Sequence, residues 1–177
     1  MLNGKIAVVT GNPKPASRTH GVALAVAGAL AAVLPGATTH PVVDLAEHAP
    51  RLFDSSDTEL SQLTAAVAAA DVAIFASPTY KASYTGMLKA FLDRYGGNGL
   101  AGTLAVPVMT GGGAGHALAV EVHLRPVLVE LGATVPARGL YVTEPELAGV
   151  EAAIAKWAAA AVPLIRGALA GYESSDR

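Results

Sequence analysis

Short apolar runs rich in β-branched residues alternate with longer Ala- and Leu-rich segments along this chain. Residues 6–10, Ile-Ala-Val-Val-Thr, form the first run, which ends at Gly11. Such a continuous run is typical of a strand that is buried on both faces, as in a parallel sheet. In residues 18–34 the apolar side chains instead recur at helical spacing. The alternation therefore predicts strands and helices in turn.

Four further strands are predicted, over residues 38–45, 71–77, 103–109 and 134–142. Helices are predicted over residues 18–34, 59–70, 84–95 and 116–131. Pro136 places the last strand at an edge or a bulge, and residues 46–57 read as a loop. A final helix is expected to begin at a capping box of Thr143 and Glu146 and to end or kink at Pro163. Right-handed crossovers then give one α/β domain, residues 1–177, with a five-stranded doubly wound parallel sheet.

The composition excludes several classes of protein. The net charge of −2, without a long run of Lys or Arg, argues against nucleic-acid binding. Cysteine is absent, which excludes disulfides and thiolate chemistry. With neither a signal peptide nor a convincing bilayer-spanning run, the expected location is the cytoplasm, with no membrane partner. Because only 15% of the residues are charged, some apolar surface is expected to be covered in an oligomer.

The loop after the first strand has the features of a phosphate site. Ligands bind doubly wound sheets beyond the carboxyl ends of the strands, where the winding reverses. This loop runs from Gly11 through Asn12 to Ser17, Arg18 and Thr19 at the start of a helix. Free N–H groups at a helix start, two hydroxyls and a guanidinium suit a phosphate dianion. The alternative is that Ser17 simply caps the helix.

The loop after the third strand offers an aromatic surface. It begins Pro78-Thr79-Tyr80-Lys81, and a flat ring ligand needs such a surface together with backbone donors. The alternative is a turn in which Tyr80 packs on its own helix.

The loop after the fourth strand contains Thr110 followed by Gly111, Gly112 and Gly113. Consecutive glycines let a backbone approach a planar ligand and expose N–H groups to its polar edge. The alternative is a flexible loop. Taken together, the three loops describe a site for a mononucleotide with a flat ring, and flavin mononucleotide (FMN) fits best.

At these segments the sequence resembles the NADPH-dependent FMN reductase family of the flavodoxin-like superfamily. It is most similar to the reductases that supply reduced flavin to alkanesulfonate-type monooxygenases. The resemblance runs over residues 4–142 and is most specific in residues 78–89. It implies a flavodoxin-like three-layer sandwich that uses FMN and NADPH or NADH, and a flavin-dependent monooxygenase as partner. It also implies a homodimer or homotetramer built through the helices after the third and fourth strands.

The resemblance assigns the predicted site residues to parts of the flavin. Ser17, Arg18 and Thr19 would surround its phosphate. The ribityl chain and ring would lie against residues 78–81, and the polar edge of the ring against residues 110–113. Hydride transfer from nicotinamide to flavin N5 depends on distance and orientation, so no general base is assigned.

One stretch departs from the family pattern. Some members carry an aromatic residue or a His insertion in the helix after the glycine loop, where it affects flavin release, and this chain has Val122 followed by His123. His116 and His123 are candidates for a catalytic role, although a His in such a helix is more often structural. One alternative, a quinone, azo or chromate reductase with tightly bound FMN, shares all of these motifs. A second, from another class, is a flavodoxin-like electron carrier. The few carboxylates argue against a carrier, while a flavin-binding regulatory protein is a third alternative.

Overall fold

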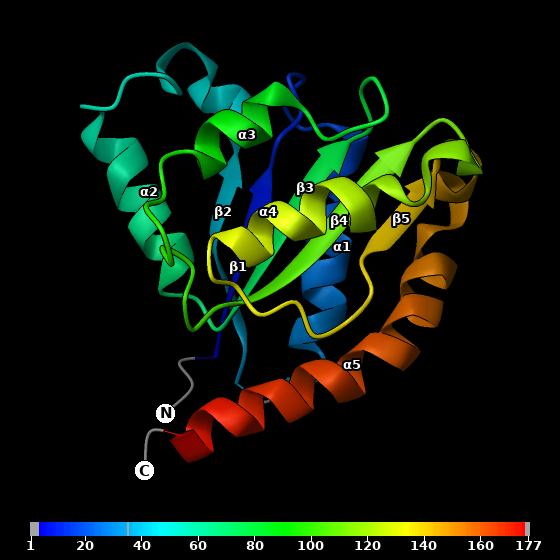
Figure 1. Cartoon of the computed structure of the whole chain (residues 1–177). Coiled ribbons are helices and arrows are strands. Elements are labelled where there is room, and N and C mark those ends of the chain that lie inside the picture. Colours follow the sequence, from blue (N-terminus) through cyan, green and yellow to red (C-terminus); the bar gives the residue numbers. More distant parts are fainter. Residues whose placement is uncertain (1–3, 35, 176–177) are drawn as a thin grey trace.

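Five parallel strands form the central sheet of the computed structural model, which describes residues 4–34 and 36–175 (Figure 1). The strands are β1 (Lys5–Thr10), β2 (Thr38–Asp44), β3 (Val72–Pro78), β4 (Leu104–Gly111) and β5 (Leu140–Thr143). Their order across the sheet is β2-β1-β3-β4-β5. The winding therefore reverses between β1 and β3, which confirms the predicted doubly wound, flavodoxin-like sheet.

Helices cover both faces of the sheet, because alternate strand residues point to opposite sides. Ile6 and Val8 face the layer that contains α1 and α5, whereas Ala7 and Val9 face the other helices. The first layer consists of α1 (Arg18–Ala31) and α5 (Val150–Ser175). The second consists of α2 (Thr58–Ala68), α3 (Gly86–Leu92) and α4 (Arg125–Glu130). The result is the three-layer sandwich that the resemblance implies (Figure 1).

Several segments differ from the predicted elements. Residues Leu45–Arg51 form a 3₁₀ helix instead of a loop, and the Asp44 carboxylate caps its start by accepting from the Ala46 N–H at 3.2 Å. The single helix predicted over residues 116–131 is broken into pieces. It comprises a 3₁₀ turn at Ala114–His116, a π-helix at Val120–Leu124 and then α4.

The predicted strand over residues 134–142 is too long at its start. Arg125 donates to the carbonyl oxygens of Val135, at 2.8 Å, and Ala137, at 2.5 Å. Glu121 accepts from the Gly139 N–H at 2.6 Å. These side chains bind the backbone of this segment, so β5 begins only at Leu140, at the edge of the sheet.

The sequence predicted that the last helix would end or kink at Pro163; α5 does not end there. Pro163 lies on the exposed side of the helix, where the missing N–H leaves a carbonyl that water can reach. The capping box of Thr143 and Glu146 is confirmed at a 3₁₀ turn, Glu144–Gly149, that leads into α5.

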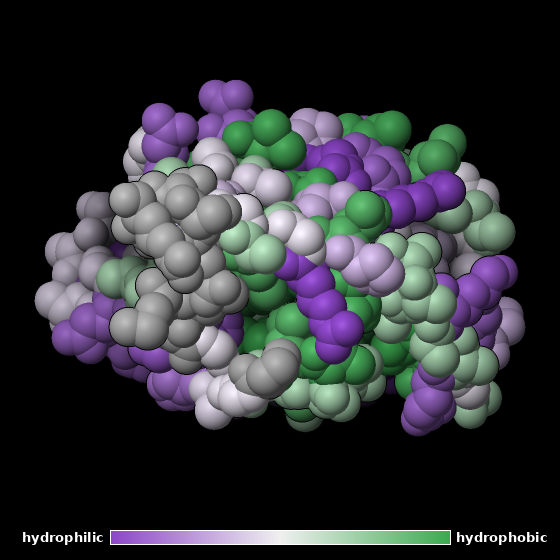
Figure 2. Space-filling view, turned by 90° about the horizontal axis from the view of Figure 1, so that it is seen from below, coloured by the Kyte–Doolittle hydropathy of each residue, from purple (hydrophilic) through white to green (hydrophobic). Residues whose placement is uncertain are grey.

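Residues Glu144–Tyr172 are long and apolar enough, by length and composition alone, to cross a membrane. In this structure the stretch instead lies against the sheet and α1, with Ile154, Ile165 and Leu169 buried among strand and α1 side chains. Seen from below, hydrophobic residues are exposed in the middle of the molecule among hydrophilic ones (Figure 2). Part of the apolar surface is therefore uncovered in the single chain.

Candidate functional site

The three predicted loops meet in one cavity of about 290 Å³ beyond the carboxyl ends of the strands. Every predicted site residue except Lys81 and Gly113 lines it. Three further residues line it that were not predicted: Lys14, Glu144 and Leu147. The complete lining is Asn12, Lys14, Ser17, Arg18, Thr19, Pro78, Thr79, Tyr80, Thr110, Gly111, Gly112, Glu144 and Leu147.

The first loop is held in shape by a carboxylate from β2. Asp44 Oδ2 accepts from the Ala16 N–H at 2.9 Å, and Ala16 has a φ of 47°, in the left-handed region. Directly after this turn Ser17 caps α1 by accepting from the His20 N–H at 3.2 Å. The N–H groups of Arg18 and Thr19 in the first turn of α1 have no carbonyl partner within the helix, so they offer donors to an anion at the cavity. The sequence could have indicated this role of Asp44, because it is an acid at the end of the strand that neighbours β1.

Buried hydroxyl groups connect the first loop to β4. Thr19 is 2% exposed, and its Oγ1 lies 2.7 Å from Thr110 Oγ1. Asn12 Nδ2 donates to the same Thr19 hydroxyl at 3.3 Å. These three side chains therefore hold the two loops together at the floor of the cavity.

The second loop forms a tight turn that leaves Tyr80 exposed. Its backbone N–H donates to Ser83 O at 2.8 Å, and the reverse bond is 3.1 Å long. Between them Lys81 and Ala82 have φ values of 52° and 66°, as a two-residue hairpin turn requires. Tyr80 is 52% exposed, which leaves much of its ring open at the cavity. Lys81 stands at the tip of the turn, outside the cavity lining.

The first and second loops are joined at Gly11. Thr85 caps α3 by accepting from the Leu88 N–H at 3.1 Å, and its hydroxyl donates to Gly11 O at 2.6 Å. A Cβ on Gly11 would lie 2.4 Å from Leu88 Cβ. Only glycine lets β1 end this close to α3.

The glycine loop is positioned by Tyr141, which the sequence analysis missed. The Tyr141 hydroxyl donates to Gly113 O at 3.2 Å and lies 3.5 Å from Thr79 Oγ1. A Cβ on Gly111 would lie 2.0 Å from the Tyr141 hydroxyl, whereas Gly112 and Gly113 face open space. Position 111 therefore needs a glycine, because a side chain there would collide with Tyr141. Gly112 leaves room at the cavity.

Charged groups lie on one side of the cavity. Arg18 is the first residue of α1, and its Nη1 donates to Glu144 Oε1 at 2.5 Å. Glu144 is the one carboxylate among the described residues that line this cavity, and Lys14 is the second cation. The helix start and the two cations favour a phosphate on this side. Tyr80 and the glycines leave the other side open for a flat ring.

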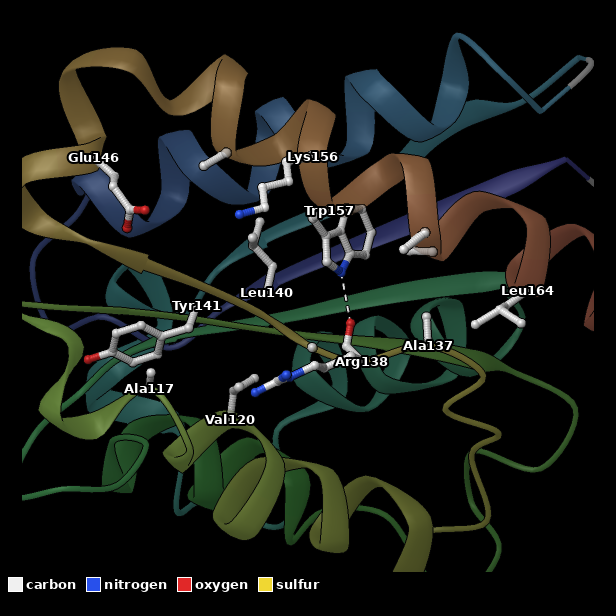
Figure 3. A pocket seen from close by; sticks show the side chains of 14 residues that line it. Ala117, Val120, Ala137, Arg138, Leu140, Tyr141, Glu146, Lys156, Trp157 and Leu164 are labelled. Atoms are coloured by element: carbon white, nitrogen blue, oxygen red, sulfur yellow. Dashed lines mark hydrogen bonds between the residues drawn. The ribbon is translucent and has the colours of Figure 1, made fainter.

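A second and larger cavity, of about 460 Å³, lies between α5, β5 and the π-helix (Figure 3). Val120 and Leu140 contribute to its apolar lining, and Trp157 Nε1 donates to Arg138 O at 2.8 Å. It contains none of the predicted site residues. The smaller cavity is the candidate site, because it combines the helix start with the polar loops.

The two candidate histidines lie outside both cavities. His116 ends the 3₁₀ turn after the glycine loop, and His123 is exposed in the π-helix. Val122, at the position where the family pattern suggests an aromatic residue, is 57% exposed. Among residues 4–34 and 36–175, no three His, Asp or Glu side chains group together as a metal site.

The fold and the site define a flavodoxin-like protein with a polar cavity beyond the carboxyl ends of its strands. The profile of the NADPH-dependent FMN reductase family matches residues 4–146, and the chain belongs to this family. The NADH-dependent FMN reductase SfnF of Pseudomonas putida is 34% identical over 142 residues, 77% of this chain and 76% of that protein.

Two further comparisons agree with this assignment. An FMN reductase (NADPH) of Escherichia coli is 38% identical over 95 residues, 54% of this chain and 49% of that protein. The crystal structure of the NADH:FMN oxidoreductase EMOB in its apo form superimposes with a TM-score of 0.75 at 30% identity. That superposition covers 86% of this chain and 87% of the EMOB chain.

Proposed function

We propose that this protein binds FMN in the smaller cavity and reduces it with NADPH or NADH. This proposal rests mainly on one observation: residues of three loops with complementary chemistry line the same cavity. The start of α1, with Ser17, Arg18 and Thr19, would hold the flavin phosphate. Pro78, Thr79, Tyr80 and the glycine loop would hold the ribityl chain and ring, with Gly113 and Lys81 at the outer edge.

The reaction transfers one hydride and takes up one proton: NAD(P)H, H⁺ and FMN give NAD(P)⁺ and FMNH₂. The chain's contribution is to bind and orient the two rings, since hydride transfer depends on distance and alignment. Exposure of Tyr80 keeps one side of the cavity accessible to the second ring. The reduced flavin would then pass to a flavin-dependent monooxygenase in the cytoplasm, as in the systems that the sequence resembles.

The helical segment after β4 supports self-association. Leu118, Val122 and Val129 are 61%, 57% and 53% exposed and recur at roughly helical spacing. Exposed apolar side chains that lie together on one surface mark a site of protein–protein contact. We therefore propose that this segment, with α3, forms the interface of a homodimer or homotetramer.

The flavin content of the purified protein, followed by NADPH and NADH oxidation with and without added FMN, tests this function. Colourless protein that oxidises either cofactor only when FMN is added supports FMN as a released substrate. Yellow protein whose turnover requires a quinone or a dye would favour a reductase with resident flavin. Protein that neither binds FMN nor oxidises a nicotinamide cofactor would contradict the proposal.

A matched pair of aromatic variants tests the location of the site. Tyr80→Ala should raise the KM for FMN, because it removes the exposed ring at the cavity. Phe53→Ala is the control, since Phe53 is 88% exposed but lies outside this cavity. Equal effects of the two substitutions would place the flavin elsewhere.

A further inference from the structure

Glu144 places a negative charge where the proposed ligand carries its phosphate. We infer that Glu144 is a specificity-determining residue that competes with the FMN phosphate for Arg18 and so weakens flavin binding. This inference rests on the proposed function. Such competition would let a site with strong phosphate donors release its flavin.

The two side chains meet across the rim of the cavity from distant parts of the chain. Arg18 begins α1 and Glu144 directly follows β5, and the two line the same cavity. Their Nη1 and Oε1 atoms are 2.5 Å apart, with the Arg18 side chain 71% exposed and the Glu144 side chain 55% exposed. The guanidinium is therefore already engaged by a carboxylate before an anion arrives.

Glu144 lies in the first turn of a helical segment, where an acid is favourable, but the turn does not use its carboxylate as a cap. The capping box at this turn uses Glu146, whose Oε2 accepts from the Thr143 N–H at 2.8 Å and from its hydroxyl at 2.6 Å. The hydrogen bond described for the Glu144 carboxylate goes to Arg18 instead. Glu144 thus acts on the cavity, whereas Glu146 stabilises the turn.

The physical effect on a bound phosphate is twofold. A carboxylate at the rim repels a phosphate dianion, and it occupies donors that would otherwise form charge-assisted bonds with the phosphate. An ion pair this exposed is weak enough to exchange. The phosphate can therefore displace Glu144 from Arg18. It then gains less binding free energy than it would gain from an arginine without a partner. Riboflavin, which has no phosphate, would not experience this competition.

The test is the Kd of FMN and of riboflavin, measured by quenching of flavin fluorescence with wild-type protein and Glu144→Gln. The substitution should tighten FMN binding by about two- to fivefold, the range expected for an exposed charge pair. Riboflavin binding should stay unchanged. FMN binding should also weaken more steeply with added salt in Glu144→Gln, because one more cation is then free to meet the phosphate.

Three further proteins complete the experiment. Arg18→Gln should weaken FMN binding, and adding Glu144→Gln to it should tighten binding by less than it does in wild-type protein, because the competition for Arg18 is gone and only the repulsion of the phosphate is relieved. Glu130→Gln, an exposed acid at the end of α4, is the matched control and should leave both affinities unchanged. Circular dichroism melting curves check that each variant is folded.

The outcomes separate this inference from the proposed function. If wild-type protein binds FMN and Glu144→Gln binds it equally or less tightly, the competition is refuted and the function stands. Equal tightening of riboflavin would also refute it, since riboflavin offers no phosphate. If wild-type protein binds neither flavin, the proposed function itself fails.

Discussion

At the scale of single residues, the role of a glycine depends on the atom that lies beside it. The sequence singled out Gly111 to Gly113 as a place where a flat ligand approaches the backbone. In the structure Gly112 faces open space, as the approach of a flat ligand requires. Gly111 has a different role: a side chain there would collide with the Tyr141 hydroxyl. Tyr141 comes from β5, and no local pattern in the sequence could show that its side chain reaches the glycine loop.

Gly111→Ala should destabilise the protein by about 1–3 kcal/mol, because the new methyl group overlaps the Tyr141 hydroxyl. It should also weaken FMN binding by about tenfold, since Tyr141 would no longer position the loop. Urea unfolding and FMN titration measure the two effects. Gly112→Ala is the control for stability and should change it by less than about 0.5 kcal/mol. Failure of Tyr141→Phe to restore any stability to Gly111→Ala would argue against this contact as the cause.

At the scale of elements, the buried strands could be predicted and the start of β5 could not. Strands β1, β3 and β4 are continuous apolar runs buried between two helix layers, and their composition shows it. The segment before β5 has similar β-forming residues, yet Arg125 and Glu121 bind its backbone. Trp157 covers another carbonyl of the same edge, that of Arg138 (Figure 3). These side chains use backbone groups that an open edge strand would otherwise offer to another chain.

Arg125→Ala should destabilise the protein by about 2–4 kcal/mol, because two backbone carbonyls and the Glu121 carboxylate lose a charged donor. Urea unfolding monitored by Trp157 fluorescence reports the change next to the affected segment. Arg138→Ala is the matched control, since the Arg138 side chain is exposed. Equal effects of the two substitutions would show that the bonds to Val135 and Ala137 do not stabilise this segment.

The start of α2 predicts a dependence of stability on pH. A hydrogen bond from the Leu60 N–H and the nearby Arg51 guanidinium lower the pKa of Asp57, the N-cap of this helix. Its folded pKa therefore lies below the unfolded value of about 3.9. The stabilisation is present above that value and is lost as the pH falls through the folded pKa.

Asp57→Asn should make the melting temperature less dependent on pH between about pH 5 and pH 2. Asn still caps the helix, so the variant should fold, but it cannot pair with Arg51. Near neutral pH the variant should melt slightly below wild type, and the two curves should converge in acid. Melting curves across this range test the prediction, with Glu130→Gln as the control. Parallel curves for Asp57→Asn and wild type would contradict it.

At the scale of the whole molecule, the candidate cavity combines what the sequence shows with what only folding brings together. Its predicted residues follow three neighbouring strands, and the fold class alone places those loops at one edge. Asp44 instead ends β2, and Glu144 directly follows β5. Their contributions depend on how far a side chain reaches across the edge, which sequence spacing does not encode.

The exposed stripe after β4 gives the last prediction. Val129→Glu should shift the protein from an oligomer to a monomer in sedimentation velocity, because a buried unpaired carboxylate strongly opposes association. Leu24→Glu is the control, since Leu24 is 39% exposed on α1, in the opposite helix layer. It should leave the oligomer intact. A monomeric wild-type protein, or dissociation by Leu24→Glu alone, would show that the stripe of Leu118, Val122 and Val129 is not the interface.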